Sequence, residues 1–366
     1  GKFKEILKAD SLTAKYLNGD LQIEVPKKRR KFKNHIEVIG ARENNLKNID
    51  VTFPLDCLTV ITGVSGSGKS TLIKKILYPA LQKKLEGVSE KAGQFTELKG
   101  SYSHIKHIEY VDQNPIGRSS RSNPVTYIKA YDDIRDLFTK QKLSKIRGYL
   151  PKHFSFNVDG GRCETCKGDG EVTIEMQFMA DVHLECETCG GKRFKKEILE
   201  VNFEGKNIDN ILTMTIDDAV AFFKEHNQSK IIQKLQPLQD VGLGYVQLGQ
   251  SSSTLSGGEA QRIKLASFLV KGTTKDKALF VFDEPTTGLH FHDIKKLLAS
   301  FEALIEKGHS IIVIEHNLDL IKCADYIIDI GPEGGENGGN LMAFGTPEEV
   351  AKDKKSITGI YLKEKL

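Results

Sequence analysis

The stretch Gly63-Val64-Ser65-Gly66-Ser67-Gly68-Lys69-Ser70 decides the fold of this chain. It matches the pattern G-x-x-x-x-G-K-[ST], in which glycines let backbone N–H groups converge on phosphate oxygens. The apolar run at residues 58–61 before it predicts a strand, and the sequence from Ser70 onward predicts a helix whose positive N-terminal end favours an anion. A strand, a phosphate-binding loop and a helix follow one another, so we expect a nucleotide site.

Two residues of this loop have expected roles with a nucleoside triphosphate. We expect Lys69 to bridge the β and γ phosphates and Ser70 to hold Mg²⁺. The other candidates for binding ATP or ADP are Gly63, Ser65, Gly66, Gly68 and Thr71. The alternative is a glycine-rich turn between strand and helix that binds no ligand.

Two carboxylates, Asp283 and Glu284, follow a second apolar run at residues 279–282. Open α/β sheets bind ligands at the carboxyl ends of their strands. Asp283 is therefore expected to help hold Mg²⁺, through water. Glu284 is the candidate general base, because hydrolysis needs a carboxylate close to the attacking water. Taken alone, an Asp-Glu pair at the end of a strand is more often a cap than a catalyst.

Strands and helices alternate on both sides of these motifs, which predicts an α/β fold with a largely parallel sheet covered by helices. The expected strands are residues 36–39, 49–53, 57–62, 107–111, 279–282, 310–314 and 326–330. The expected helices are a short lead-in helix within the first thirty residues, residues 127–140, 260–270 and 293–306, and a short closing helix after Pro347.

Four of the six cysteines form two Cys-x-x-Cys pairs, Cys163 with Cys166 and Cys186 with Cys189. The interval between the pairs falls in the range of about 15 to 20 residues that is typical of structural Cys₄ zinc sites. We therefore expect these four thiolates to bind Zn²⁺. Two separate redox pairs are the weaker alternative, because neither pair lies on a thioredoxin-like strand-to-helix unit.

The segment between the cysteine pairs alternates polar and apolar residues at 171–178, as a half-exposed strand does. It predicts a zinc-tied β-hairpin with residues 179–181 near its tip. The remaining cysteines, Cys57 and Cys323, are expected to be buried thiols, since free cysteine usually behaves as a small hydrophobe.

Composition and charge restrict the class of protein only loosely. The chain has 39% hydrophobic and 28% charged residues and a net charge of +4, which gives weak support for a nucleic-acid partner. No run approaches the roughly 20 apolar residues of a membrane span, and the N-terminal residues do not form a secretory signal. We expect a cytoplasmic protein without a membrane partner. The basic run at residues 27–31 is interpreted as a solvated linker rather than a DNA-binding arm.

Basic residues gather after residue 114, where the alternation of strands and helices gives way to a segment rich in Arg, Ser and Pro. The loop at residues 117–123 combines arginines with hydroxyl side chains, which suits contact with DNA phosphates. The DNA-binding candidates are Arg118, Arg121, Lys129 and Arg135. A solvated charged face is an equally good interpretation of the helix that follows, because Asp132, Asp133 and Asp136 lie on it.

The stretch Leu255-Ser256-Gly257-Gly258-Glu259-Ala260-Gln261-Arg262 resembles the signature of ABC ATPases. Gln113, after the strand at residues 107–111, resembles the glutamine of that family's Q-loop, and His316 resembles its switch histidine. The resemblance implies that Gln113 senses Mg²⁺ and water, and that His316 contacts the γ-phosphate. It also implies that Ser256, Gly257 and Gly258 complete the nucleotide site of a facing domain. The chain would then need a partner half, either a second copy or a longer parent protein.

The combination of motifs resembles the C-terminal half of the UvrA family, the A subunit of the bacterial excinuclease. The resemblance runs through Asn44-Asn45-Leu46-Lys47-Asn48, residues 113–119, the zinc module, residues 283–290 and Gly331-Pro332-Glu333-Gly334-Gly335. It implies an ABC-type P-loop ATPase domain with an inserted zinc-containing domain. The expected parts are a lead-in and basic linker at 1–35, the ATPase domain at 36–113 and 242–366, and the insertion at 114–241.

This resemblance implies a dimeric ATPase of nucleotide excision repair that binds damaged double-stranded DNA and loads the UvrB subunit, without being a nuclease itself. The resemblance also implies that the sequence lacks the family's N-terminal half, which engages UvrB. A related ATPase that protects a cell against DNA-binding drugs would keep every motif. A transporter ATPase and a zinc-dependent DNA-binding module without ATPase activity are weaker alternatives. Arg42 is a candidate for stacking on adenine.

Overall fold

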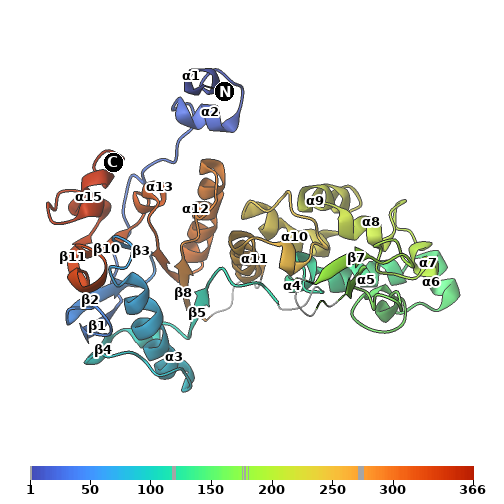
Figure 1. The fold of residues 1–366 in the computed structure, drawn as a ribbon, viewed down its shortest axis with the longest axis horizontal. Helices are drawn as coiled ribbons and strands as arrows, with labels where there is room; N and C mark the ends of the chain where they lie inside the picture. Colours follow the sequence, from blue (N-terminus) through green and yellow to red (C-terminus); the bar gives the residue numbers. More distant parts are fainter. Residues whose placement is uncertain (1, 118–120, 175, 177–178, 180, 271–275) are drawn as a thin grey trace. The chain divides into compact units, whose positions relative to one another are not determined.

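The computed structural model describes residues 2–117, 121–174, 176, 179, 181–270 and 276–366. The chain forms two compact units, Gly1–Asp112 with Lys271–Leu366, called the first unit below, and Gln113–Val270, called the second unit (Figure 1). The second unit begins one residue before the expected insertion and continues past residue 241. It does so because helix α11 (Gly257–Val270) packs against α10 (Ser229–Asp240).

The first unit contains two sheets and the helices around them. Its strands are β1 (His35–Ala41), β2 (Ile49–Pro54), β3 (Leu58–Thr62), β4 (Glu97–Gly100), β5 (His107–Val111), β8 (Ala278–Asp283), β9 (Ser310–Ile314), β10 (Tyr326–Gly331) and β11 (Asn340–Gly345). Its helices are α1 (Phe3–Ile6), α2 (Leu12–Leu17), a π-helix η1 (Thr71–Leu77), α3 (Tyr78–Glu86), the 3₁₀ turn η2 (Tyr102–His104), α12 (Phe291–Glu306), α13 (Leu318–Ile321), the 3₁₀ turn η5 (Gly335–Asn337), α14 (Pro347–Val350) and α15 (Ile357–Leu362).

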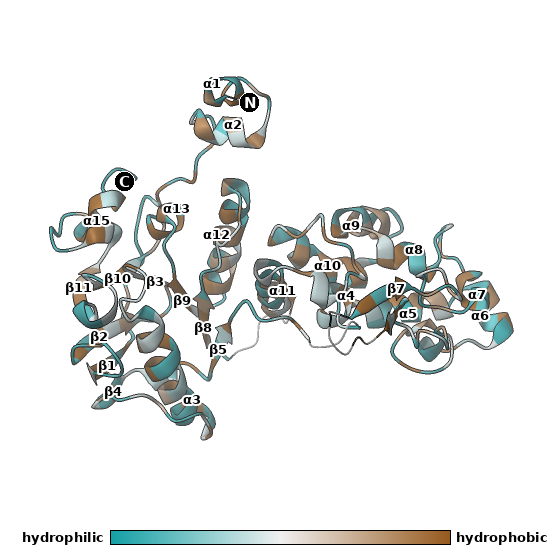
Figure 2. Ribbon diagram, in the orientation of Figure 1, coloured by the Kyte–Doolittle hydropathy of each residue, from teal (hydrophilic) through white to brown (hydrophobic). Residues whose placement is uncertain are grey.

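The larger sheet has six strands in the order β11-β10-β3-β9-β8-β5. Neighbouring strands are parallel from β10 to β5, and only β11 is antiparallel to its neighbour. Both β3 and β9 are buried along their whole length, and brown, hydrophobic residues run through β9 (Figure 2). Strands covered on both faces carry continuous apolar runs, so the fold class expected from the sequence is confirmed.

The smaller sheet is antiparallel, with the order β2-β1-β4. Its apolar residues share one core cluster with the helix pair η1 and α3 and with the six-stranded sheet. This sheet and the edge strand β11 were not anticipated, because the expected strands were read as members of one largely parallel sheet.

The N-terminal lead-in packs on the first unit through α2. The Tyr16 ring stacks on Phe291 with ring centroids 5.5 Å apart, and the Thr13 hydroxyl lies 3.0 Å from Nε2 of His290. The expected lead-in helix is present as α1 and α2. These contacts hold the lead-in at the N-terminal end of α12.

The basic run at residues 27–31 is only partly solvated, so its interpretation as a solvated linker is wrong for the two arginines. Arg29 donates to the Glu348 carboxylate and to the carbonyl oxygen of Ala324. Arg30 pairs with Glu302 and with Asp325, whose side chain is 6% exposed. Acceptors at residues 302, 324–325 and 348, which are distant from this segment in sequence, thus hold the two arginines in place. A run of basic residues does not by itself predict these contacts.

The second unit is mainly helical. Its helices are α4 (Pro124–Tyr127), α5 (Ala130–Thr139), α6 (Lys142–Arg147), the 3₁₀ turn η3 (Pro151–Phe154), α7 (Lys196–Leu199), α8 (Ile208–Thr213), α9 (Ile216–Glu225), α10, the 3₁₀ turn η4 (Ser252–Thr254) and α11. Its strands are β6 (Glu171–Ile174) and β7 (Val182–Glu185). The expectation of a single helix at residues 127–140 is wrong. Lys129 has a φ of 59°, which interrupts the helix and separates α4 from α5.

Strands β6 and β7 form the expected hairpin, with Ile174 opposite Val182. The expectation of a half-exposed strand is wrong for residues 171–174, since all four residues of β6 and all four of β7 are exposed. Residues 175, 177 and 178 of the expected strand lie outside the described residues. The residues proposed for the tip include 180, which lies outside the described residues, whereas Met179 is described and exposed. The two-stranded ribbon therefore has no buried face of its own.

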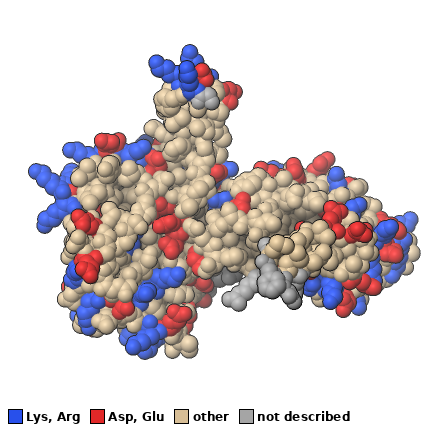
Figure 3. All heavy atoms as spheres, in the orientation of Figure 1, with Lys and Arg blue, Asp and Glu red and all other residues tan. Residues whose placement is uncertain are grey.

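Charged residues of both signs are interspersed on the face shown in Figure 3. Among the helices described, none combines the length and apolar character needed to cross a membrane. Cys57 and Cys323 are buried, as expected.

Replacing Asp325 with Ala should lower the free energy of unfolding of the first unit. The Asp325 carboxylate accepts hydrogen bonds from the backbone N–H groups of Leu58 and Arg30, at 3.0 and 2.8 Å, and both donors would lose their partner. Such losses cost about 2 to 4 kcal/mol in total. Urea unfolding followed by circular dichroism measures the change. Asp10→Ala is the control, because Asp10 is fully exposed and its pair with Lys15 should contribute nothing measurable. Equal stability of the two variants would contradict the expectation.

Candidate nucleotide site and metal centre

The loop from Gly63 to Ser70 follows β3 directly and has the backbone of a phosphate cradle. Gly63, Gly66 and Gly68 have φ angles of 133°, 75° and 112°, a region that favours glycine. A Cβ atom on Gly63 would lie 1.9 Å from the carbonyl oxygen of Ile330. Only glycine fits at this position, so the conformation of the loop depends on the neighbouring strand β10.

The Lys69 side chain lies inside this loop and is 6% exposed. Its Nζ donates to the carbonyl oxygens of Gly63 and Val64 at 3.0 and 2.8 Å. Burial lowers the pKa of Lys69, and the nearby carboxylates, Glu284 foremost, oppose that shift. A buried ammonium group beside backbone N–H groups is suited to an anionic ligand.

The Ser67 hydroxyl is a second, independent indication that this loop fits a phosphate ligand. It is fully buried and has no hydrogen-bond partner among the described residues. An unpaired buried hydroxyl costs free energy unless a ligand or water meets it. Together with Lys69 and the start of η1 at Thr71, it fits the phosphate groups of a nucleotide.

Asp283 is the last residue of β8 and lies at the carboxyl edge of the sheet. The hydroxyl of Tyr110 on β5 donates to its Oδ2 at 2.8 Å. Burial raises the pKa of Tyr110, and Asp283 raises it further, so the phenol stays protonated and remains a donor. Tyr110 was not singled out from the sequence, although it stands three positions before Gln113.

Glu284 and His316 come from neighbouring strands and face each other, with Nε2 of His316 3.7 Å from Oε1 of Glu284. Burial and the positive charge of Lys69 lower the pKa of His316, and Glu284 and Glu315 oppose the shift. Glu284 has a φ of 46°, which is unusual for a residue other than glycine, and its N–H donates to the carbonyl oxygen of Ile314. The residues proposed as general base and γ-phosphate sensor are thus adjacent.

A cavity of about 210 Å³ lies beside the phosphate loop and His316. It is lined by Thr62, Gly63, Val64, Glu315, His316, Leu318 and Ile321, and by Ile357, Thr358 and Tyr361 around helix α15. Asp329 connects these parts, because its carboxylate accepts hydrogen bonds from the hydroxyls of Thr62, Ser356 and Thr358. An aspartate within an apolar run, as at Asp329 in β10, is the sequence signal for such a polar contact.

A second glycine-rich loop, residues 331–339, lies against the phosphate loop. The N–H of Gly335 donates to the carbonyl oxygen of Gly66, and that of Gly339 donates to the carbonyl oxygen of Ser67. Asn45 bridges the two loops, since its amide donates to the carbonyl oxygens of Gly66 and Gly335, each at 3.0 Å. Asn45 and Gly335 belong to the two stretches that carry the family resemblance in the sequence, whereas Gly339 lies outside them.

The signature turn and Gln113 belong to the second unit. Ser256 and Glu259 cap the start of α11 reciprocally, through Ser256 N–H to Glu259 Oε2 at 2.7 Å and Glu259 N–H to Ser256 Oγ at 3.3 Å. A Cβ atom on Gly257 would lie 2.9 Å from Cβ of Gln113, so these two backbones are close together. Gly258 continues the first turn of α11. The turn is therefore prearranged as the N-terminal end of a long helix.

The four cysteines of the two Cys-x-x-Cys pairs come together, with all four sulfur atoms within 4.8 Å of one another. The Sγ–Sγ distances are 3.9 Å for Cys163 with Cys186 and 3.7 Å for Cys166 with Cys189. Zinc–sulfur bonds of about 2.3 Å in a tetrahedron imply sulfur–sulfur distances of about 3.8 Å. The donor set and its size fit a structural Zn²⁺.

The basic residues proposed for DNA lie in different settings. Arg121 pairs with Asp169, at 3.1 Å from Nε to Oδ1, and Asp169 lies three residues after Cys166 of the cysteine cluster. Arg135 pairs with Asp132 and lies over the Tyr131 ring. Lys129 stands at the break between α4 and α5, and Arg118 lies outside the described residues.

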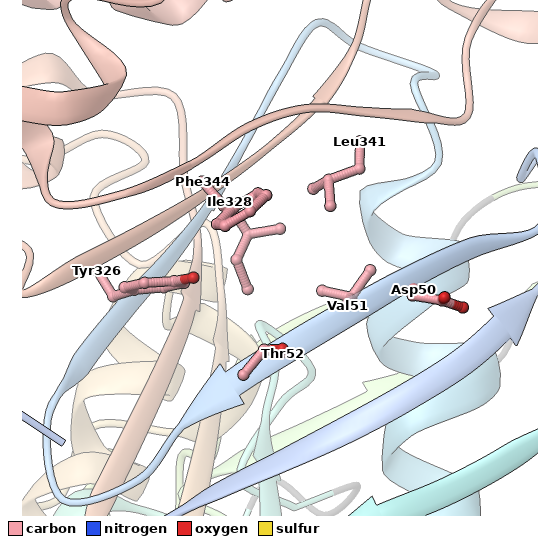
Figure 4. A pocket seen from close by; sticks show the side chains of 7 residues that line it. All are labelled: Asp50, Val51, Thr52, Tyr326, Ile328, Leu341 and Phe344. Carbon is pink, nitrogen blue, oxygen red and sulfur yellow. The ribbon is translucent and has the colours of Figure 1, made fainter. Parts of the chain in front are cut away.

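Two further features of the first unit bear on ligand binding. Arg42, the candidate for adenine, donates to the carbonyl oxygen of Gly40 and to the Thr96 hydroxyl. Figure 4 shows a pocket of about 60 Å³. It is lined by Asp50, Val51, Thr52, Tyr326, Ile328, Leu341 and Phe344. Ligand sites usually enclose about 300 to 1,000 Å³, so this pocket is too small for a nucleotide.

The chain was compared with known proteins. It is 54% identical over 368 residues to UvrABC system protein A of Clostridium perfringens, a match that covers 100% of this chain and 39% of that protein. It is 55% identical to UvrABC system protein A of Clostridium acetobutylicum, over 98% of this chain and 38% of that protein. The chain thus spans about two fifths of the length of these curated relatives. No family model matches the chain.

A solved structure gives the same result. The crystal structure of UvrA2 from Deinococcus radiodurans superimposes with a TM-score of 0.90 at 42% identity, over 99% of this chain and 43% of that chain. The resemblance stated from the sequence motifs is confirmed.

The purified protein should contain about one zinc ion per chain, and Cys186→Ala should remove it. Loss of one thiolate from a four-thiolate site weakens binding strongly, because the remaining ligands leave the metal exposed to exchange. Metal analysis after gel filtration measures the content. Cys323→Ala is the matched control, since Cys323 is also buried but lies in the first unit, and it should keep the zinc. Wild-type protein without zinc would contradict the assignment.

Proposed function

Because this chain belongs to the UvrA family along its whole length, we propose that it is an ATP-hydrolysing module of DNA-damage recognition in nucleotide excision repair. The observation that carries the proposal is the convergence of Lys69, Asp283, Glu284 and His316 at one edge of a parallel sheet. Binding and hydrolysis of ATP would be coupled to binding of distorted double-stranded DNA. A cytoplasmic location is part of this proposal.

The proposed reaction is the attack of water on the γ-phosphate of Mg²⁺-bound ATP. The Gly63–Ser70 loop and Lys69 would hold the phosphates, and Ser70 and Asp283 would hold Mg²⁺, which when bound would neutralise charge on the phosphates. Tyr110 keeps the Asp283 carboxylate oriented through its hydroxyl. Glu284 accepts the proton of the attacking water, and His316, kept neutral by its lowered pKa, contacts the γ-phosphate.

The site requires a second module. Ser256, Gly257 and Gly258 begin a helix of 14 residues, and the N-terminal end of such a helix can donate to a γ-phosphate. In the proposed assembly this turn completes the site of a facing module, either the N-terminal half of the same protein or a second copy, and Gln113 senses Mg²⁺ and water. UvrB would be engaged by the complete protein.

The zinc module and the basic residues near it are proposed to contact DNA. Arg118, Arg121, Lys129 and Arg135 would meet phosphates rather than bases, which suits recognition of distortion over sequence. Arg121 pairs with Asp169 and Arg135 pairs with Asp132, so each would have to exchange a carboxylate for a phosphate on binding. A drug self-resistance ATPase of the same family would share every one of these features.

ATP hydrolysis should be measured with and without damaged duplex, on the chain alone and mixed with the N-terminal half of a UvrA-family protein. We expect hydrolysis to need the mixture and to respond to damaged DNA. Absence of nucleotide binding by the chain would refute the ATPase proposal. Hydrolysis that responds to DNA-binding drugs but not to lesions would favour self-resistance.

Lys69→Ala should abolish hydrolysis and weaken ATP binding, because the phosphates lose their cation. Glu284→Gln should keep ATP bound and lower the turnover number by about 100-fold or more, since only the general base is lost. Fluorescent nucleotide titration and phosphate release measure the two effects. Glu306→Gln, at the exposed end of α12, is the control and should behave as wild type. Normal turnover by Glu284→Gln would remove Glu284 from the catalytic site.

Replacing Arg118 and Arg121 together with Ala should weaken binding to duplex DNA by about tenfold at low salt and flatten its salt dependence, because phosphate contacts release counterions. Nucleotide affinity should not change. Fluorescence anisotropy with labelled duplex at two salt concentrations measures the effect. Lys4→Ala combined with Lys15→Ala, on α1 and α2, controls for the loss of two positive charges elsewhere. Unchanged DNA affinity would exclude both arginines from the interface.

A further inference from the structure

Glu315 is a buried carboxylate that the proposed reaction does not use. It follows β9 directly, and 3% of its surface is exposed. Burying a carboxylate to this extent costs free energy unless hydrogen bonds from the protein replace those to water. The neighbouring His316 was singled out from the sequence, whereas Glu315 was not.

Four donors meet this carboxylate, two on each oxygen. Oε1 accepts from the backbone N–H of Thr286 at 2.9 Å and from its hydroxyl. Oε2 accepts from the backbone N–H groups of His316 and Asn317, at 2.7 and 2.9 Å. The two oxygens therefore bind two different loops, one after β8 and one after β9.

These loops carry the two facing residues of the site. Thr286 lies two residues after Glu284, and the N–H of Glu284 donates to the carbonyl oxygen of Ile314 at 3.0 Å. The segment after β8 is thus joined to the end of β9 by this backbone bond and to Glu315 by the bonds from Thr286. Hydrogen bonds to the N–H groups of His316 and Asn317 would be enough to stabilise the turn that contains Glu315. The two bonds to Thr286 are not part of that turn and connect it to the loop after β8.

We propose that Glu315 is a positioning residue that couples the loop of Glu284 to the loop of His316. It acts through Thr286 and sets the distance between the carboxylate that accepts the proton and the imidazole that meets the γ-phosphate. A shift of His316 on phosphate binding is thereby transmitted to Glu284. The inference rests on the proposed ATPase function and adds a means of regulation at the same site.

Glu315→Gln tests the coupling, because a carboxamide has one acceptor oxygen and turns its NH₂ group toward N–H donors. In the mixture with the N-terminal half of a UvrA-family protein, we expect kcat to fall by about tenfold or more and KM for ATP to change by less than about threefold, since the phosphate loop is untouched. Thr286→Val should lower kcat in the same way, and Thr286→Ser, which keeps the hydroxyl, should restore it. Turnover at the wild-type rate by both Glu315→Gln and Thr286→Val would overturn the proposal.

Two measurements separate positioning from loss of folding. In a Glu284→Gln background, Glu315→Gln should cause no further loss of turnover, because its effect passes through Glu284. Amide hydrogen exchange needs no hydrolysis: Thr286→Val on one loop should speed exchange at His316 and Asn317 on the other, with the rest of the first unit unchanged. Unchanged exchange there would overturn the coupling, whereas failure of wild-type protein to bind ATP would refute the ATPase proposal instead.

Discussion

Parallel pairing of β3 with β9 and β10, and of β9 with β8, is the constraint on which the site depends. It brings the carboxyl ends of these strands to one edge, where each continues into a loop with a functional side chain. The phosphate loop follows β3, the Asp283–Glu284 pair ends β8, and His316 follows β9. The residues of these strands are buried along nearly their whole length, as expected for parallel strands that are covered on both faces.

The loops at this edge are held by polar contacts rather than by the core. Asp329 gathers the hydroxyls of Thr62, Ser356 and Thr358, and Asn45 joins the phosphate loop to the glycine-rich loop after β10. Glu315 joins two more loops. Each of these polar side chains is satisfied by donors or acceptors from other segments, so residues outside the proposed catalytic set help to fix the geometry of the loops.

Much of this arrangement follows from local sequence, and part of it does not. The phosphate loop, the carboxylate pair and the cysteine quartet have fixed spacings whose chemistry is explicit, so the residues that come together could be named from the sequence. Tyr110, Glu315 and Asp329 could not, because each acts on a segment far away along the chain. The pairs of Arg29 and Arg30 illustrate the same limit, since a basic run gives no sign of the acidic partners that fold against it.

The ribbon of β6 and β7 has exposed residues on both faces, and a two-stranded ribbon is marginally stable in water. Its order must come from its base, where the two cysteine knuckles meet. With zinc as the proposed occupant, the local folding equilibrium of the ribbon becomes a function of free metal concentration. Cellular zinc supply would then govern how much of this arm exists in a defined shape, independently of the stability of either unit's core.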